Sequence, residues 1–178
     1  DPSVDVIVGV IGGIEPAREL ITTALQAGKP VVTGNKELLA NVGTELFAAA
    51  DANGVDLLFC NLAEAQEWTG EQRPEDAAEG LRKVARSFAI TLGGEGALVF
   101  DGRHYHRIAP HPVKPIDTNG AGDMFAGAYI YGITNGFDAV TAGRLANRAA
   151  AQLVTHYGPR LPAAAHRQLL DEFSREQG

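Results

Sequence analysis

The sequence predicts an α/β fold, in the form of a single three-layer α/β/α domain with a mainly parallel sheet. Its 178 residues are enough for one domain with a hydrophobic core and too few for two domains of ordinary size. Apolar, β-branched stretches alternate with helical stretches, as they do in βαβ units. The connections are short and the chain has no internal repeat or long linker, so we expect residues 1–178 to form one domain.

The first third of the chain predicts strand, helix, strand, helix and strand in turn. Its first run, VDVIVGVI, is continuously apolar and β-branched, which is typical of a strand covered on both faces. Pro16 falls in the first turn of the next helix, and Gly28 ends it. The predicted elements span residues 4–11, 12–28, 30–35, 36–54 and 55–60.

After Cys60 the elements become shorter and glycine turns more frequent. The pattern predicts a short helix that begins at an Asn cap, a longer amphipathic helix, two or three strands with tight glycine turns, and three final helices. These elements span residues 61–70, 73–87, 88–109, 120–135, 138–157 and 162–176.

Composition excludes several classes of function. The net charge of −7, without a basic stripe, argues against a nucleic-acid partner. No apolar run is long enough to span a membrane, and the acidic start, DPSVD, lacks the zones of a signal peptide. The single cysteine, Cys60, rules out an internal disulfide and favours a reducing compartment. We therefore expect a cytoplasmic location.

The stretch IDTNGAGDMFAGA, residues 116–128, suggests phosphoryl-transfer chemistry. Small residues at the start of a helix let backbone N–H groups converge on an anion, and the helix dipole adds to the attraction. An aspartate beside such a site could take a proton from an attacking hydroxyl. Glycine before a helix is, however, most often only a turn, so this motif needs support from its surroundings.

That support comes from four stretches in a fixed order: NLAE followed by WTG, ITLGGEGALVF, DTNGAGDMFAGA and ANRAAAQLVTHYG. Together they resemble the C-terminal half of the ribokinase-like (PfkB) family of carbohydrate and nucleoside kinases, and the resemblance covers residues 58–178. It implies binding of ATP and Mg²⁺ and transfer of phosphate to an alcohol.

The resemblance also implies a role for individual residues. Asp123 matches the catalytic base of the family, and Asn61 and Glu64 match the pair that organises Mg²⁺ largely through water. Asp117 matches a residue associated with monovalent-cation binding in some members. The matches to the anion hole and the nucleotide site are Gly120, Ala121, Gly122, Thr91, Gly93, Gly96 and Asn147.

Residues 1–57 resemble a different family. The blocks IGGIEPA and VVTGNKELLA are similar to part of the NAD(P)-binding Rossmann domain of homoserine dehydrogenase. On this resemblance, Lys36 matches a lysine of the dehydrogenase active region, and residues 33–35 match a loop near the nicotinamide. The dinucleotide fingerprint G-x-G-x-x-G is absent from this stretch, so we do not expect NAD(P) binding.

His104, His106 and His111 lie close together in the sequence and raise the question of a metal site. No cysteine or carboxylate lies at a spacing from them that is typical of metal ligands. We interpret them as histidines on the surface of a strand.

These observations lead to an expectation of a chimera. The kinase's front half, with its acceptor pocket, is replaced by a dehydrogenase-like piece (1–57), the join lies in a shared strand, and the chain lacks an initial Met. We therefore expect an engineered, recombinant protein with little or no catalysis that binds at most a nucleotide or phosphate. The alternative is a working sugar or nucleoside kinase that uses Asp123. Its acceptor site would come from Asn35, Lys36 and Glu37 or from a homodimer, which an uncovered sheet edge would also favour.

Overall fold

The computed structural model describes residues 3, 7–9, 14–29, 31–33, 41–42 and 55–177. The chain divides into two compact units. The first comprises residues 1–58 with 63–88, and the second comprises residues 59–62 with 89–178.

The first unit opens with the predicted strand, helix and strand. β1 (Ile7–Gly9) and β2 (Val31–Thr33) pair in parallel, with Ile7 opposite Val31 and Gly9 opposite Thr33. α1 (Ala17–Gln26) joins them and buries Ala17 and Ile21. Parallel neighbours require such a crossover, so the βαβ prediction for this stretch is confirmed.

α3 (Leu62–Thr69) and α4 (Pro74–Leu81) also belong largely to this unit. They pack closely, because a Cβ atom at Gly80 would lie 2.7 Å from Cγ2 of Thr69. α4 ends earlier than the predicted helix 73–87. The chain leaves the helix because Ala85 forms a parallel bridge with Val55, which needs extended backbone rather than helix.

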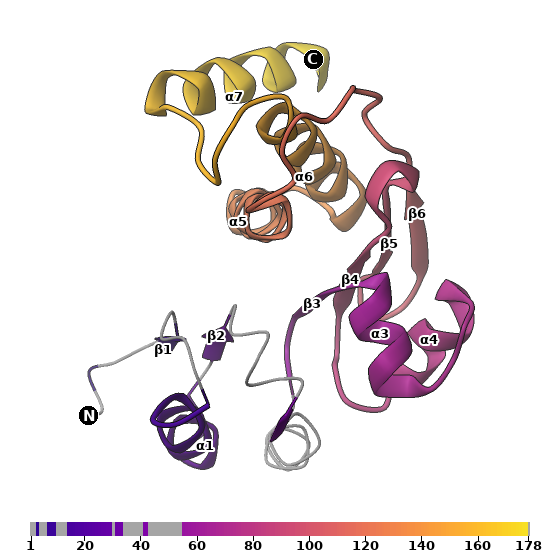
Figure 1. Ribbon diagram of the computed structural model, residues 1–178, viewed down its shortest axis with the longest axis vertical. Coiled ribbons are helices and arrows are strands. Elements are labelled where there is room, and N and C mark those ends of the chain that lie inside the picture. Colours follow the sequence, from indigo (N-terminus) through magenta and orange to yellow (C-terminus); the bar gives the residue numbers. More distant parts are fainter. Residues whose placement is uncertain are drawn as a thin grey trace. The chain divides into compact units, whose positions relative to one another are not determined.

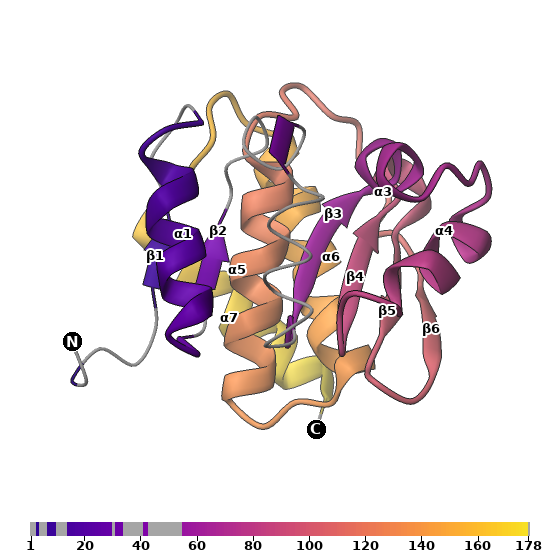
Figure 2. The same ribbon diagram turned by 90° about the horizontal axis from the view of Figure 1, so that it is seen from below.

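The second unit contains a four-stranded sheet in the order β3-β4-β5-β6 (Figure 2). The strands span Leu58–Asn61, Phe88–Thr91, Ala97–Phe100 and Tyr105–Ile108. β5 is buried along its whole length, as its apolar sequence ALVF indicates. β5 and β6 run antiparallel, because the four-residue turn between them is too short for a parallel crossover. The sheet is therefore mixed, and the α/β fold class is confirmed.

Three helices complete this unit: α5 (Ala121–Thr134), α6 (Ala139–Val154) and α7 (Ala163–Gln177), which lie together in Figure 1. α6 is central, since it packs against α5, α7, β5 and β6. Small residues permit the close approach. A Cβ atom at Gly132 would lie 2.8 Å from Cβ of Ala142, and one at Gly143 would lie 2.8 Å from Cγ1 of Ile108.

The helix α7 covers α6 through an apolar contact flanked by ion pairs. Leu145 and Ala149 of α6 pack against Leu169 and Phe173 of α7.

No helix in the described part of the chain is both long and apolar enough to cross a membrane.

Candidate active site

The N-terminus of α5 is built on a residue that must be glycine. Gly120 precedes the helix in the left-handed conformation, with a φ of +76°. A Cβ atom at Gly120 would lie 2.8 Å from Cβ of Pro159 and 2.9 Å from its Cα. The backbone angle and the close contact both exclude a side chain. Gly122 faces open space instead, with no atom within 4 Å of a Cβ built on it.

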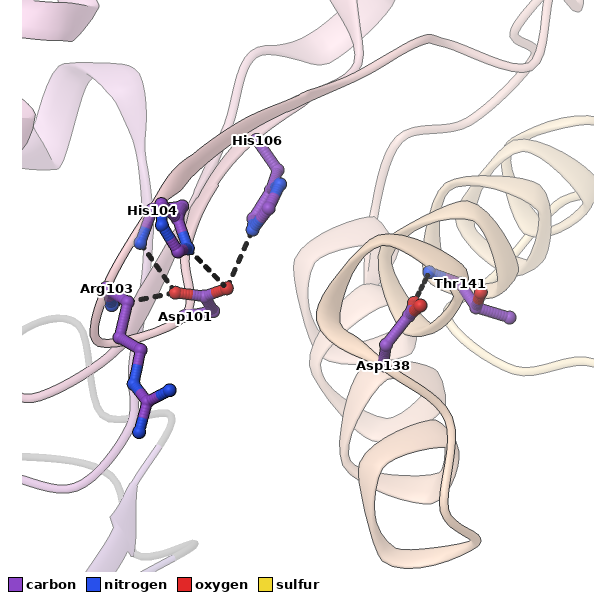
Figure 3. A network of polar contacts seen from close by, with 6 residues as sticks. All are labelled: Asp101, Arg103, His104, His106, Asp138 and Thr141. Atoms are coloured by element: carbon purple, nitrogen blue, oxygen red, sulfur yellow. Dashed lines mark hydrogen bonds and ion pairs between the residues drawn. The ribbon is translucent and has the colours of Figure 1, made fainter.

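No side chain caps this end of α5. α6 differs, because the Asp138 carboxylate accepts a hydrogen bond of 2.7 Å from the N–H of Thr141 (Figure 3). At α5 the N–H of Ala121 donates to the carbonyl oxygen of Thr118 over 3.3 Å. The N–H groups of Gly122 and Asp123 come next, in the first turn, where an α-helix offers no internal partner and its dipole is positive. The N–H of Met124 already donates to the carbonyl oxygen of Gly120 over 2.9 Å. This end of α5 is therefore suited to an anion.

Asp123 lies in the first turn of α5 and is exposed to solvent. The opposite face of the helix is anchored by buried aromatic rings. Phe125 and Tyr129 stack with ring centroids 6.2 Å apart, and Phe59 of β3 meets Tyr129 edge-on at 5.6 Å. This packing keeps the Asp123 carboxylate at the surface beside the start of the helix, where a substrate hydroxyl could reach it.

Asp117 fastens the loop before α5 to the turn after α6. Its Oδ1 accepts a hydrogen bond of 3.0 Å from the N–H of Asn119, and its Oδ2 accepts one of 2.9 Å from the N–H of Gly158. The N–H groups of Ile116 and Asp117 donate to the carbonyl oxygen of Val154 over 2.7 and 3.2 Å. The bonds from Asn119 and Gly158 hold the pKa of the Asp117 carboxyl below its usual value, since they stabilise the charged form.

Gly96 and Asn147, which the sequence places at the nucleotide, meet at the segment that follows β6. Gly96 has a φ of +90°, and a Cβ atom on it would overlap the carbonyl oxygen of Ile108 and lie 2.9 Å from the nitrogen of Pro110. The Asn147 side chain donates from Nδ2 to the carbonyl oxygen of Ala109 over 2.8 Å. The structure therefore brings these two predicted residues to the same backbone segment, residues 108–110.

Thr91 and Gly93 lie at the turn between β4 and β5. The Thr91 hydroxyl donates to the carbonyl oxygen of Cys60 on β3 over 3.5 Å. Gly93 begins a short 3₁₀ helix, η1 (Gly93–Glu95), with a φ of +58°. The Leu92 N–H closes the turn by donating to the carbonyl oxygen of Gly96 over 2.8 Å. Gly93 is exposed, and no atom lies within 4 Å of a Cβ built on it, so the turn presents its bare backbone at this residue.

Asn61 and Glu64 lie where β3 passes into α3. Asn61 is the last residue of the strand, and Glu64 is in the first turn of the helix; both are half-buried. An amide oxygen and one carboxylate suit Mg²⁺, which keeps several waters and needs few charged ligands. These donors fit the metal expected from the sequence. Asn35, Lys36 and Glu37, the expected acceptor residues, lie outside the described residues.

The sequence analysis did not find the contacts of Asp101, which lies in the turn between β5 and β6. Its Oδ2 lies 2.8 Å from Nε2 of His106 and 3.9 Å from Nδ1 of His104, and its Oδ1 accepts the N–H groups of Arg103 and His104, each over 2.7 Å (Figure 3). These bonds, led by the one from the His104 backbone, lower the pKa of Asp101 far below its usual range. Within the described residues, no group of three or more His, Cys, Asp or Glu could hold a metal ion.

The turn after α6 was also missed as part of the site. The Gly-Pro pair at 158–159 was the available signal, because such pairs mark turns. The pattern gives no means of seeing that this turn contacts a loop about 40 residues earlier in the chain.

Comparison with known proteins identifies the family to which this chain is similar. Residues 18–165 match the model of the pfkB family carbohydrate kinases. Among solved structures, adenosine kinase from Sinorhizobium meliloti is similar with a TM-score of 0.78 and 26% identity, over 93% of this chain and 54% of that one. Fructokinase from Vibrio cholerae, bound to fructose, ADP and calcium, is similar with a TM-score of 0.71 and 25% identity, over 93% and 60%. The chain thus spans a little over half the length of these kinases.

The homoserine dehydrogenase resemblance is real but partial. The chain is 49% identical to the Bacillus subtilis enzyme over 59 residues, which are 33% of this chain and 14% of that protein. It is 52% identical to the Mycobacterium tuberculosis enzyme over 95 residues, 53% of this chain and 18% of that protein. A match of 95 residues cannot lie within residues 1–57 alone. The chain spans less than a fifth of these curated relatives, and the division at residues 57 and 58 stays a prediction.

The expectation of a chimera with little or no catalysis is wrong as a prediction of function, and its engineered origin is not supported. The family match begins at residue 18, well inside the supposedly foreign segment, and the kinase structures cover 93% of the chain. The physical reason is that residues 7–33 form a parallel βαβ unit, a frame that different enzyme families use, so dehydrogenase-like residues can occupy a kinase frame. The kinase alternative is the better supported interpretation, and the chain belongs to the pfkB family of carbohydrate kinases.

Proposed function

We propose that the chain provides the phosphoryl-transfer site of an ATP-dependent kinase that phosphorylates a hydroxyl group of a sugar or nucleoside. Family membership supports the reaction class. Because the chain spans about half the length of the similar kinases, its acceptor, activity and partners are all part of this proposal. We do not propose NAD(P) binding, since the dinucleotide fingerprint is absent from the sequence.

In the proposed reaction Asp123 acts as the general base. Its carboxylate takes the proton of the acceptor hydroxyl while the hydroxyl oxygen forms a bond to the γ-phosphorus of ATP. The bond between that phosphorus and the bridging oxygen breaks, and ADP leaves. The backbone around Gly120, Ala121 and Gly122, at the positive end of α5, stabilises the charge on the transferred group.

The remaining predicted residues hold the nucleotide and its ions. Asn61 and Glu64 would hold Mg²⁺ through water, and the metal would neutralise phosphate charge. Asp117 is the candidate for a monovalent cation. The nucleotide would lie along Thr91, Gly93, Gly96 and Asn147, of which the last two already meet at one segment.

The names of the similar kinases support a choice of acceptors. Their names include adenosine kinase and fructokinase. Sugars such as fructose and nucleosides such as adenosine are therefore the first acceptors to test. If a second copy of the chain completes the acceptor site, the specific rate will rise with protein concentration.

One observation carries the proposal: an uncapped helix start behind an obligatory glycine, with an exposed aspartate in its first turn. The test is a coupled assay of ADP release with Mg·ATP and a panel of sugars and nucleosides. We expect one acceptor class to stimulate release, and Asp123→Asn to lower kcat by roughly 10²–10⁴-fold while Mg·ATP binding persists.

The matched control is Asp171→Asn, an equally conservative change of an exposed aspartate on α7, which should leave kcat unchanged. Acceptor-stimulated release that survives Asp123→Asn would contradict the assignment of the base. Failure of every acceptor to stimulate release, in a chain that melts cooperatively, would contradict the proposed function itself.

A further inference from the structure

We propose that the Asn119–Gly120 step, directly before α5, is a site of spontaneous modification at which Asn119 loses its side-chain amide and becomes aspartate or isoaspartate. The conversion places a new negative charge beside the start of α5 and switches off its binding of an anion. The modification follows from the local structure alone, whereas its effect on anion binding rests on the proposed function.

The chain contains three Asn–Gly steps, at residues 53–54, 119–120 and 135–136, of which the first lies outside the described residues. At such a step the backbone nitrogen of glycine reaches the side-chain carbonyl carbon of asparagine readily, because glycine has no Cβ atom to obstruct the approach. A bond between that nitrogen and that carbon closes a succinimide ring. The proton of the nitrogen passes through water to the departing amino group, which leaves as ammonia. Water then opens the ring at either carbonyl and yields aspartate or isoaspartate.

The step at Asn135 is closed to this reaction by hydrogen bonds at the end of α5. The side-chain Nδ2 of Asn135 donates to the carbonyl oxygen of Tyr131 over 2.8 Å, which fixes the amide that would be attacked. The N–H of Gly136, the group that would attack, donates to the carbonyl oxygen of Ile133 over 3.3 Å. Both bonds must break before the two groups can meet, and together they slow the reaction by roughly tenfold or more.

The step at Asn119 is open by comparison. Asn119 is exposed to solvent, so water can carry the proton and hydrolyse the ring. The hydrogen bonding of α5 begins after this step, where the N–H of Ala121 donates to the carbonyl oxygen of Thr118. Within the part of the chain that the structure describes, no hydrogen bond uses the N–H of Gly120. The attacking nitrogen is therefore available.

The contact of the Asn119 side chain also leaves the point of attack accessible. Hydrogen bonds to Asp117, led by the one from the Asn119 backbone and including one from the Asn119 side-chain amide, hold the pKa of Asp117 below its usual value. A charged carboxylate can only accept hydrogen bonds, so this contact uses the amide nitrogen of Asn119 and not its carbonyl group. The contact joins groups that water reaches, unlike a bond within the last turn of a helix.

Conversion of Asn119 acts on the proposed anion site in two ways. A carboxylate appears one residue before Gly120, at the positive end of α5, where it repels a phosphate group. Isoaspartate also lengthens the backbone by a methylene group next to Gly120, whose contact with Pro159 leaves no room for a methyl group. We expect the affinity for Mg·ATP to fall by roughly tenfold or more.

Peptide mapping of the purified full chain tests the modification. The chain is kept at a mildly alkaline pH and digested at intervals with chymotrypsin, which cuts at the aromatic residues between Asn119 and Asn135. Chromatography with mass spectrometry then separates the asparagine, aspartate and isoaspartate forms. In the folded chain Asn119 should convert at least about tenfold faster than Asn135, and in urea the two rates should be similar. Equal rates in the folded chain would overturn the proposal.

Substitutions separate the modification from its effect on binding. Asn119→Gln keeps the amide but resists conversion, because its longer side chain would have to close a larger and less favoured ring. In calorimetry with Mg·ATP, the fresh wild type and Asn119→Gln should bind alike, and only the wild type should lose affinity with age, in step with the converted fraction. Asn119→Asp should bind roughly tenfold more weakly from the start. Asn135→Asp, the matched control at the other end of α5, should bind as the wild type does.

The outcomes distinguish this inference from the proposed function. An aged wild type that carries a converted Asn119 and keeps its full affinity for Mg·ATP would overturn the switch, as would a folded Asn119→Asp that binds as well as Asn119→Gln. A fresh wild type that melts cooperatively yet does not bind Mg·ATP would instead overturn the proposed function, and the switch with it. The peptide map decides the modification itself in every case.

Discussion

Two glycines of one motif, Gly120 and Gly122, should respond in opposite ways to the same change to alanine. Gly120 has a φ of +76°, and a Cβ atom on it would meet Pro159 at 2.8 Å. Gly122 is the second residue of α5, has no strained angle, and would place its Cβ in open space. The pair separates the structural demands of the loop from its proposed chemistry.

For Gly120→Ala two costs add. A left-handed residue with a side chain costs about 1–2 kcal/mol, and forcing a methyl group into a closed contact costs about 1–3 kcal/mol. Unfolding free energy should therefore fall by about 2–5 kcal/mol, or about 5–15 °C in Tm for a chain of this size. For Gly122→Ala the helix gains up to about 1 kcal/mol, since alanine is the better helix former.

The assay is chemical unfolding followed by circular dichroism, together with Mg·ATP calorimetry on both variants. Gly122→Ala should be at least as stable as the wild type yet bind Mg·ATP more weakly, because its methyl group occupies the approach to the helix end. A destabilised Gly122→Ala, or a Gly120→Ala as stable as the wild type, would refute the reasoning from geometry. Undiminished Mg·ATP binding by Gly122→Ala would refute the placement of the anion.

Three further predictions concern electrostatics in the second unit. Arg148→Ala removes ion pairs of 2.8 Å to Glu172 and 2.7 Å to Glu176. Tm should therefore fall by about 2–4 °C, and this loss should shrink at high salt. Arg167→Ala on α7 should leave Tm almost unchanged. The folded pKa of Asp101 is depressed below its ordinary value of 3.8. Its stabilisation is therefore fully present above pH 3.8 and is lost as pH falls from there through the lower folded pKa, so Asp101→Asn should flatten the acid limb of a stability–pH profile measured by urea unfolding. Burial raises the pKa of Tyr129 to about 12 from 10.0, so stability should fall as pH rises through that interval, and a melting series in which Tyr129→Phe shows the same alkaline loss would contradict this.

Much of the fold could be predicted from local pattern. The helix at 121–134 lies within one residue of its predicted ends, because Gly120 and Asn135 mark both boundaries chemically. The helix predicted at 73–87 was too long, since its last residues are helical by pattern yet pair with Val55 by tertiary contact. The strands predicted within residues 88–109 are present, and the short turn accounts for the antiparallel β5–β6 pair.

The site was predictable only where a motif is contiguous. The segment from Asp117 to Asp123 can be read directly from the sequence, and its proposed chemistry rests on the same motif. The contact of Gly120 with Pro159, and that of Asp117 with Gly158, depend on a return of the chain after α6 that no local pattern encodes. The functional prediction failed for a related reason, because likeness of residues 1–57 to another enzyme was taken to mean loss of the kinase frame.

The central claim is phosphoryl transfer to an alcohol with Asp123 as base, and one experiment tests it most directly. The full chain is incubated with Mg·ATP and a mixed pool of sugars and nucleosides, and the pool is searched by mass spectrometry for a phosphorylated product. The account predicts one product class that disappears in Asp123→Asn and persists in Asp171→Asn. A pool that stays unphosphorylated while the folded chain binds Mg·ATP, or a product that forms equally in Asp123→Asn, would contradict it.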